Sequence, residues 1–193
     1  MPLRRTKGQR RRHEVGDVFV LQAADSRYRF GRVVKVGQSG SRGRFPGGIL
    51  AYIYDVAYDD LQCDLATLTV DRLLMPPFFT MNWPWQKGYF RTVAHEDLEP
   101  AHVLRQHCFY DASTEGYVDE NDDILRERVE PCGWFALTNF EHFQHELDEA
   151  LAGRPARWRK HRPGSSGRCN SRTSPSGGSP SPRQGRRPAS TAH

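Results

Sequence analysis

The hydrophobic pattern of the N-terminal third predicts β-strands. Residues 18–21 are continuously apolar and β-prone, and residues 24–26 have the composition of a hairpin tip. The next run alternates at period two, which places four side chains on one face: Tyr28, Phe30, Val34 and Val36. After a glycine-rich loop over 37–48, residues 49–56 give a third β-prone segment. Three antiparallel strands so close in sequence predict a curled sheet of the SH3-like type.

Weaker strand signals follow in the middle of the chain. Residues 88–93 are β-prone, and residues 107–110 and 115–118 flank a turn-forming stretch, which predicts an antiparallel pair. Residues 59–67 have the composition of a short helix.

One amphipathic helix is predicted from about 139 to 152. Thr138 and Glu141 have the spacing of a capping box, and Gly153 is suited to a left-handed C-terminal cap. The apolar positions then fall on one helix face: Phe140, Phe143, Leu147, Ala150 and Leu151. The predicted fold is α+β, mainly β, with a curled antiparallel sheet closed by this C-terminal helix.

Charge divides the chain into three predicted segments. Residues 1–12 carry six basic residues and no acid, and residues 154–193 carry ten basic residues and no acid. All 23 acidic residues therefore lie in 13–153 against 12 basic ones, which gives this segment a net charge of −11. The tail over 154–193 contains no Leu, Ile, Val or Phe and is predicted to be disordered, as is the basic segment 1–12. One folded domain is expected over 13–153.

The composition favours a cytoplasmic protein that works without a membrane. The apolar runs are too short to span a bilayer, and no apolar segment of a secretion signal follows the basic start. The cysteines lack C-x-x-C spacing, so free thiols in a reducing compartment are expected at Cys63, Cys108, Cys132 and Cys169.

Motifs that carry chemistry are incomplete in this sequence. Residues 119–123 resemble the start of a calcium loop, but the sixth position is Ile124 where an EF-hand needs glycine. His142 and His145 lack a third ligand at diagnostic spacing. His107 and Cys108 are adjacent on a predicted strand and therefore point to opposite faces. We expect no enzyme activity, no metal and no cofactor.

Several segments, taken in order, resemble the immunity protein 26 family of bacterial polymorphic toxin systems. They are residues 15–19, 28–33, 84–90, 106–109, 117–120 and 132–137. The resemblance covers roughly 14–153, and the 154–193 tail is outside the family pattern. The residues of these segments that we expect to serve the fold are Gly16, Asp17, Phe19, Trp85, Gly88, Phe90, His107, Phe109, Gly133 and Trp134.

The resemblance implies a protein that binds a cognate toxin and neutralises it by occlusion. An acidic domain suits a basic toxin, for example a nuclease whose groove accepts phosphates. The candidate contacts for such a toxin are Asp59, Asp60, Asp119, Glu120, Asp122 and Asp123.

Two other functions remain open on sequence grounds. The basic ends favour nonspecific binding to nucleic acid, which predicts a steep dependence on salt. An SH3-like adaptor would instead grip short linear peptides with its aromatic residues. Trp83, Trp85, Tyr89 and Phe90 could stack nucleic-acid bases, but basic residues are sparse in the body and core packing is the favoured role for these aromatics.

Overall fold

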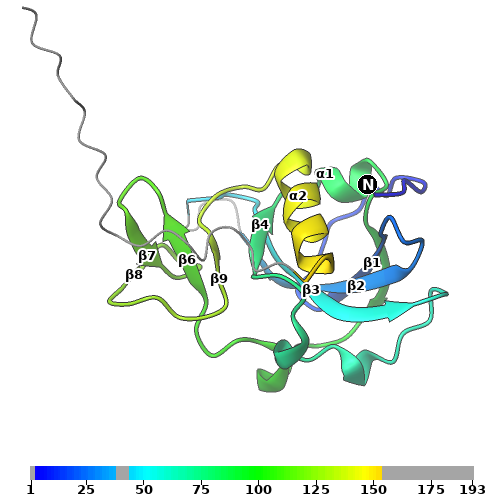
Figure 1. Cartoon of the computed structure of the whole chain (residues 1–193), viewed down its shortest axis with the longest axis horizontal. Helices are drawn as coiled ribbons and strands as arrows, with labels where there is room; N and C mark the ends of the chain where they lie inside the picture. The colour runs from blue at the N-terminus through cyan, green and yellow to red at the C-terminus, as the bar shows by residue number, and fades with distance from the viewer. Residues whose placement is uncertain (1–2, 38–43, 154–193) are drawn as a thin grey trace, which may run out of the picture. The chain divides into compact units, whose positions relative to one another are not determined.

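In a computed structural model, which describes residues 3–37 and 44–153, the chain forms two β-sheets (Figure 1). The larger sheet has the order β4-β3-β2-β1-β5, and each neighbouring pair in it is antiparallel. Its strands are β1 (Asp17–Gln22), β2 (Tyr28–Val36), β3 (Ile49–Tyr58), β4 (Phe78–Thr80) and β5 (Arg91–His95). The sheet is open, because β4 and β5 are its two edges. The tail predicted over 154–193 lies outside the described residues.

The smaller sheet has the order β8-β7-β6-β9. Its strands are β6 (Cys108–Asp111), β7 (Gly116–Val118), β8 (Ile124–Leu125) and β9 (Cys132–Trp134). The first three strands pair antiparallel, whereas β9 pairs parallel with β6. The predicted strand pair over 107–110 and 115–118 is confirmed as β6 and β7, and so is a mainly β fold. The SH3-like curl stays a prediction.

The helical elements are short except for α2 (Phe140–Leu151). The others are α1 (Trp83–Gln86) and three 3₁₀ turns at Leu65–Thr67, Val70–Arg72 and Pro100–His102. The predicted helix over 59–67 is therefore reduced to a single turn at its end. No helix among the described residues is long and apolar enough to cross a bilayer.

The predicted capping box of α2 is wrong. The N-cap is Asn139, whose side chain accepts a hydrogen bond from the backbone N–H of His142 at 2.9 Å. The backbone N–H of Thr138, which the predicted capping box would direct to the Glu141 side chain, donates instead to the carbonyl of Phe79 in β4. The chain thus leaves the edge of the sheet one residue later than the sequence spacing suggests.

Both faces of the larger sheet are buried. Along β3, Ile49, Ala51 and Ile53 face a cluster that contains Phe143 and Leu147 of α2. The alternate residues of β3, Leu50, Tyr52 and Tyr54, face a second cluster. This cluster also contains Phe109 and Val118 of the smaller sheet and Phe135 after β9. The larger sheet is therefore a middle layer, with α2 on one face and the smaller sheet on the other.

The predicted face of β2 is wrong at its last residue. Phe30 and Val34 lie in the cluster toward the smaller sheet, but Val36 packs against the cluster under α2. The pairing between β2 and β3 shifts register between Val33 and Lys35. Because a one-residue shift moves a side chain to the other face, strict period two ends there.

The expected disorder of residues 1–12 is wrong for residues 3–12, which we call the N-terminal strap. Leu3 is buried at 5% exposure. The backbone N–H of Thr6 donates to the carbonyl of Gly88 at 2.7 Å, and that of Gln9 donates to Trp85 at 2.9 Å. The Gln9 side chain accepts from Thr92 on β5 at 2.8 Å. The strap thus satisfies backbone groups beside an edge strand, which a composition-based argument does not detect.

Gly88 is needed where the strap lies on the domain. Its φ of +79° is in the left-handed region, and a Cβ there would lie 2.0 Å from the carbonyl oxygen of Thr6. A side chain at this position would push the strap away.

The strap also brings its positive charge into the folded body. Residues 3–153 carry 18 basic and 23 acidic residues, a net charge of −5 in place of the −11 expected for 13–153. At one anchor point, Arg11 donates two hydrogen bonds of 3.0 Å to Asp17, whose side chain is fully buried.

We predict that Arg11→Gln lowers the free energy of unfolding by about 1–3 kcal/mol, because it removes a bidentate, charge-assisted contact from a buried carboxylate. Arg12→Gln is the matched control, since Arg12 is an exposed neighbour on the same strap. It should change stability by less than about 0.5 kcal/mol. Urea unfolding at pH 7 measures both, and equal effects of the two substitutions would contradict the anchored strap.

Candidate functional site

A hydrogen-bonded chain of three side chains connects the two sheets. The Tyr52 hydroxyl on β3 lies 2.6 Å from Nε2 of His107, immediately before β6. Nδ1 of His107 lies 3.0 Å from Oε2 of Glu120, two residues after β7. Tyr52 is fully buried and His107 is 5% exposed. The chain therefore runs from the interior of the larger sheet to the loop between β7 and β8.

The protons in this chain can be placed from its ends. The backbone N–H of Leu104 donates to the Tyr52 oxygen at 3.2 Å, and burial raises the pKa of Tyr52, so this hydroxyl keeps its proton. The hydrogen bond from His107, assisted by the charge of Lys35, lowers the pKa of Glu120 to about 2. Glu120 is thus an ionised acceptor, and Nδ1 of His107 is the donor to it.

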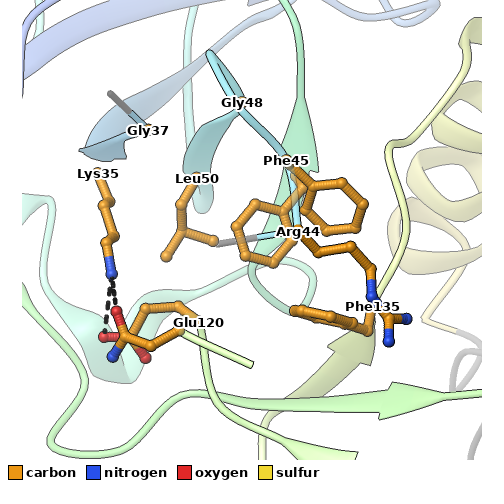
Figure 2. A pocket seen from close by; sticks show the side chains of 10 residues that line it. Lys35, Gly37, Arg44, Phe45, Gly48, Leu50, Glu120 and Phe135 are labelled. Atoms are coloured by element: carbon orange, nitrogen blue, oxygen red, sulfur yellow. Dashed lines mark hydrogen bonds and ion pairs between the residues drawn. The ribbon is translucent and has the colours of Figure 1, made fainter. Parts of the chain in front are cut away.

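A cavity of about 130 Å³ opens beside Glu120 (Figure 2). The apolar residues that line the cavity are Phe45, Leu50, Phe79 and Phe135. The polar and charged residues that line it are Lys35, Arg44, Glu120 and Asn121. Figure 2 shows Lys35 extending toward Glu120, and the distance from Nζ to Oε1 is 3.9 Å. The Lys35 ammonium also donates to the Asn121 side chain.

The loop over 119–123 is held by its own acidic side chains. Asp119 accepts hydrogen bonds from the backbone N–H groups of Asn121 and Asp123 at 2.7 and 3.0 Å. Asp122 lies 3.6 Å from Arg44, which also pairs with the buried Asp111 at 3.0 Å. Asp123 is exposed. Most acids of this loop therefore fix its shape, and Asp123 faces solvent.

The other two candidate acids lie at the opposite end of the larger sheet. Asp59 pairs with Arg27 at 3.4 Å and its side chain is 92% exposed, and Asp60 accepts from the backbone N–H of Gln62. Both follow the end of β3 where Tyr58 pairs with Tyr28. Lys35, which contacts the 119–123 loop, is near the other end of β2, roughly 25 Å away along the strand. The structure does not bring the six acids together.

The residues that resemble the family lie mostly in the interior. Phe19, Trp85, Phe90 and Phe109 are at most 1% exposed, and Trp134 is half-buried against Tyr110. Asp17 is the buried partner of Arg11, and His107 belongs to the chain that connects the sheets. Three glycines permit close approaches, because a Cβ would lie within 2.3 Å of a backbone oxygen at Gly16, Gly88 and Gly133.

His142, which was considered for metal binding, and the His107–Cys108 pair have other partners in the structure. No group of three or more potential metal ligands occurs in 3–37 and 44–153. His142 instead pairs with Glu146 at 3.1 Å, which raises the pKa of His142. His107 and Cys108 point apart, since His107 contacts Tyr52 and Glu120 whereas Sγ of Cys108 lies 3.1 Å from Sγ of Cys132.

Sequence reasoning missed Tyr52, Lys35 and Arg44. Tyr52 occurs in a continuously β-prone run, where nothing distinguishes it from its neighbour Tyr54. Lys35 and Arg44 flank a glycine-rich loop and carry no motif. Their roles depend on the packing of the smaller sheet against β3, a long-range contact without a local signal.

We predict that Glu120→Gln removes part of the acid sensitivity of the fold. The folded-state pKa of Glu120 lies below its ordinary value of 4.5, at about 2. The hydrogen bond that ionised Glu120 accepts from His107 therefore stabilises the protein fully above pH 4.5, and this stabilisation is lost as the pH falls toward 2. The wild type should lose about 2–3 kcal/mol more than the variant across this range.

Urea unfolding at several pH values measures this difference. Asp123→Asn is the control, because Asp123 is an exposed carboxylate on the same loop. Parallel pH profiles for the wild type and Glu120→Gln would show that ionised Glu120 contributes nothing to stability.

The chain resembles one known protein family. A family model described as immunity protein 26 matches residues 14–116, which include β1 to β6 and both Tyr52 and His107. No curated protein and no solved structure matches the chain. Because the match covers more than half of the 193 residues, the chain belongs to the immunity protein 26 family.

Proposed function

We propose that this protein binds the toxin domain of its own polymorphic toxin system and neutralises it by covering the toxin's active site. The membership of the immunity protein 26 family supports this proposal most directly. Occlusion needs a complementary surface and no catalytic group, so we assign no catalytic residue and no cofactor. The protein would act in the cytoplasm of the producing cell, on toxin that has not yet been exported.

The distribution of charge supports a basic toxin, for example a nuclease. Residues 107–130, which include β6, β7 and β8, carry eight acidic and two basic residues, a net charge of −6. The strap at residues 3–12 carries six basic residues and no acid. A basic protein is therefore attracted to the smaller sheet and repelled by the strap, which raises its association rate and orients it.

The six candidate acids divide into two roles in this proposal. Asp123 is exposed on the loop and is available for direct contact with a basic partner, whereas Asp59 and Asp60 are exposed far from the loop and attract such a partner at long range. Asp119, Glu120 and Asp122 are half-buried and hold the shape of the loop through the contacts described above.

An exposed apolar residue supports the loop as a contact surface. Ile124 is the first residue of the edge strand β8 and directly follows Asp123 in the sequence. Its side chain is 87% exposed, the most exposed of the large apolar side chains in the described residues. Interfaces commonly combine a central apolar anchor with a polar rim. Ile124, which directly follows Asp122 and Asp123 in the sequence, fits that arrangement.

The strap gives a second candidate function, nonspecific binding to nucleic acid. Five of its six basic residues are exposed without a carboxylate partner among the described contacts: Arg4, Arg5, Lys7, Arg10 and Arg12. This function predicts an affinity for DNA that falls steeply with salt and is lost when these residues are neutralised.

The test is a calorimetric titration of the full chain with the toxin domain encoded beside it. We expect saturable 1:1 binding at nanomolar affinity or tighter. Neutralising the six candidate acids to Asn or Gln should weaken binding by about 10–100-fold, mainly through slower association. Neutralising only Asp59, Asp60 and Asp123 should give most of that loss, because these acids are exposed.

The control variant is Asp71→Asn/Glu141→Gln, which removes two exposed acids outside the candidate set and should keep the wild-type affinity. Unchanged affinity in a sixfold variant that still unfolds cooperatively would contradict the acidic contact. If the wild type gives no heat with the toxin but binds DNA in a salt-dependent manner, the second function replaces the first.

A further inference from the structure

Two buried cysteines face each other across the parallel pair of the smaller sheet. Cys108 in β6 and Cys132 in β9 are direct register partners. Their sulfur atoms are 3.1 Å apart, and the two residues are 0% and 1% exposed. Both are free thiols in this structure. The third cysteine among the described residues, Cys63, contacts Tyr58 and Thr67 in another part of the fold.

The backbone already has the geometry that a disulfide requires. Neighbouring strands of a sheet lie ~4.8 Å apart, and the Cα atoms of disulfide-bonded cysteines are usually ~4.4–6.8 Å apart. Closing the sulfur–sulfur distance to a bond length requires a movement of about 1 Å, which small side-chain rotations supply. No change in strand pairing is needed.

One of the two thiols is suited to be the attacking group. The contact with the Cys132 sulfur, together with the backbone N–H of Val129 at 3.4 Å, lowers the pKa of Cys108 below its ordinary value. In the closed fold Cys108 therefore loses its proton more readily than Cys132, and the thiolate is the reactive form. The same contact raises the pKa of Cys132.

We propose that Cys108 and Cys132 are an oxidation site that closes to an intramolecular disulfide when the chain meets a small-molecule disulfide such as oxidised glutathione. The Cys108 thiolate attacks one sulfur of the oxidant, forms a mixed disulfide and releases one thiol. Cys132 then loses its proton and attacks Sγ of Cys108, which releases the second thiol. Two protein thiols are oxidised and one disulfide is reduced to two thiols, which take up the two protons.

The reaction needs access that the closed fold does not provide, because both sulfur atoms are buried. β9 has three residues and is an edge strand of the smaller sheet. Short edge elements open at low free-energy cost, so the oxidant reaches the pair while β9 is detached or before it docks during folding.

The bond would enclose the segment that we propose as the toxin-binding surface. The 119–123 loop and Ile124 lie between Cys108 and Cys132 in the sequence. A cross-link between β6 and β9 closes residues 108–132 into a covalent loop, which reduces the conformational freedom of the unfolded chain. The inference does not depend on the proposed function, since it rests on the positions of the two sulfur atoms.

The test uses the full chain with Cys63→Ser and Cys169→Ser, so that two thiols remain. It is refolded in a buffer of oxidised and reduced glutathione and then analysed by intact mass and by peptide mapping. We expect a mass loss of about 2 Da, a single peptide link between Cys108 and Cys132, and a melting temperature raised by roughly 5–10 °C. A reducing agent should reverse all three.

Adding Cys108→Ser or Cys132→Ser to this background gives the matched controls, which should carry one glutathione in place of the link. A two-cysteine chain that keeps both thiols free would overturn the proposal. So would a stable glutathione adduct on it without the link between Cys108 and Cys132. A link that forms but lowers the melting temperature would overturn the claim that the fold is already shaped for it.

Discussion

The hydrogen-bonded chain from Tyr52 through His107 to Glu120 is the constraint on which the rest of the site depends. It begins inside the larger sheet and ends at the loop after β7, so both sheets must be docked for its groups to be satisfied. Leaving any of these buried polar groups unpaired is costly. Glu120 also lies 3.9 Å from the ammonium group of Lys35, which lines the cavity. The position of the acidic loop is thus coupled to the packing of the core.

The larger sheet can position the hydrogen-bonded side chains from Tyr52 to Glu120 because both of its faces are covered. One face packs under α2 and the other under the smaller sheet, and the strap covers the β5 edge. Gly16, Gly88 and Gly133 stand where backbone segments approach too closely for a side chain. The family resemblance is therefore concentrated in residues that fix the scaffold, whereas the proposed toxin contacts lie on a loop that the scaffold positions.

The sequence predicted the local elements better than the contacts between them. The strands β1, β2 and β3 and the β6–β7 pair have clear periodicity or turn signals, so their approximate positions could be predicted. The order of the strap was missed, because its six basic residues suggest disorder while its backbone hydrogen bonds have no sequence signal. The parallel pairing of β9 with β6 and the Tyr52–His107 contact join residues far apart in the chain. Local patterns contain no information on such pairs.

We infer that the toxin binds at the smaller sheet, over the loop that Glu120 holds and over Ile124. Hydrogen–deuterium exchange of the full chain, free and saturated with its toxin domain, tests this claim most directly. We expect slower exchange in peptides that cover residues 117–126 and unchanged exchange in the strap. Slower exchange confined to the strap, with residues 117–126 unaffected, would contradict it.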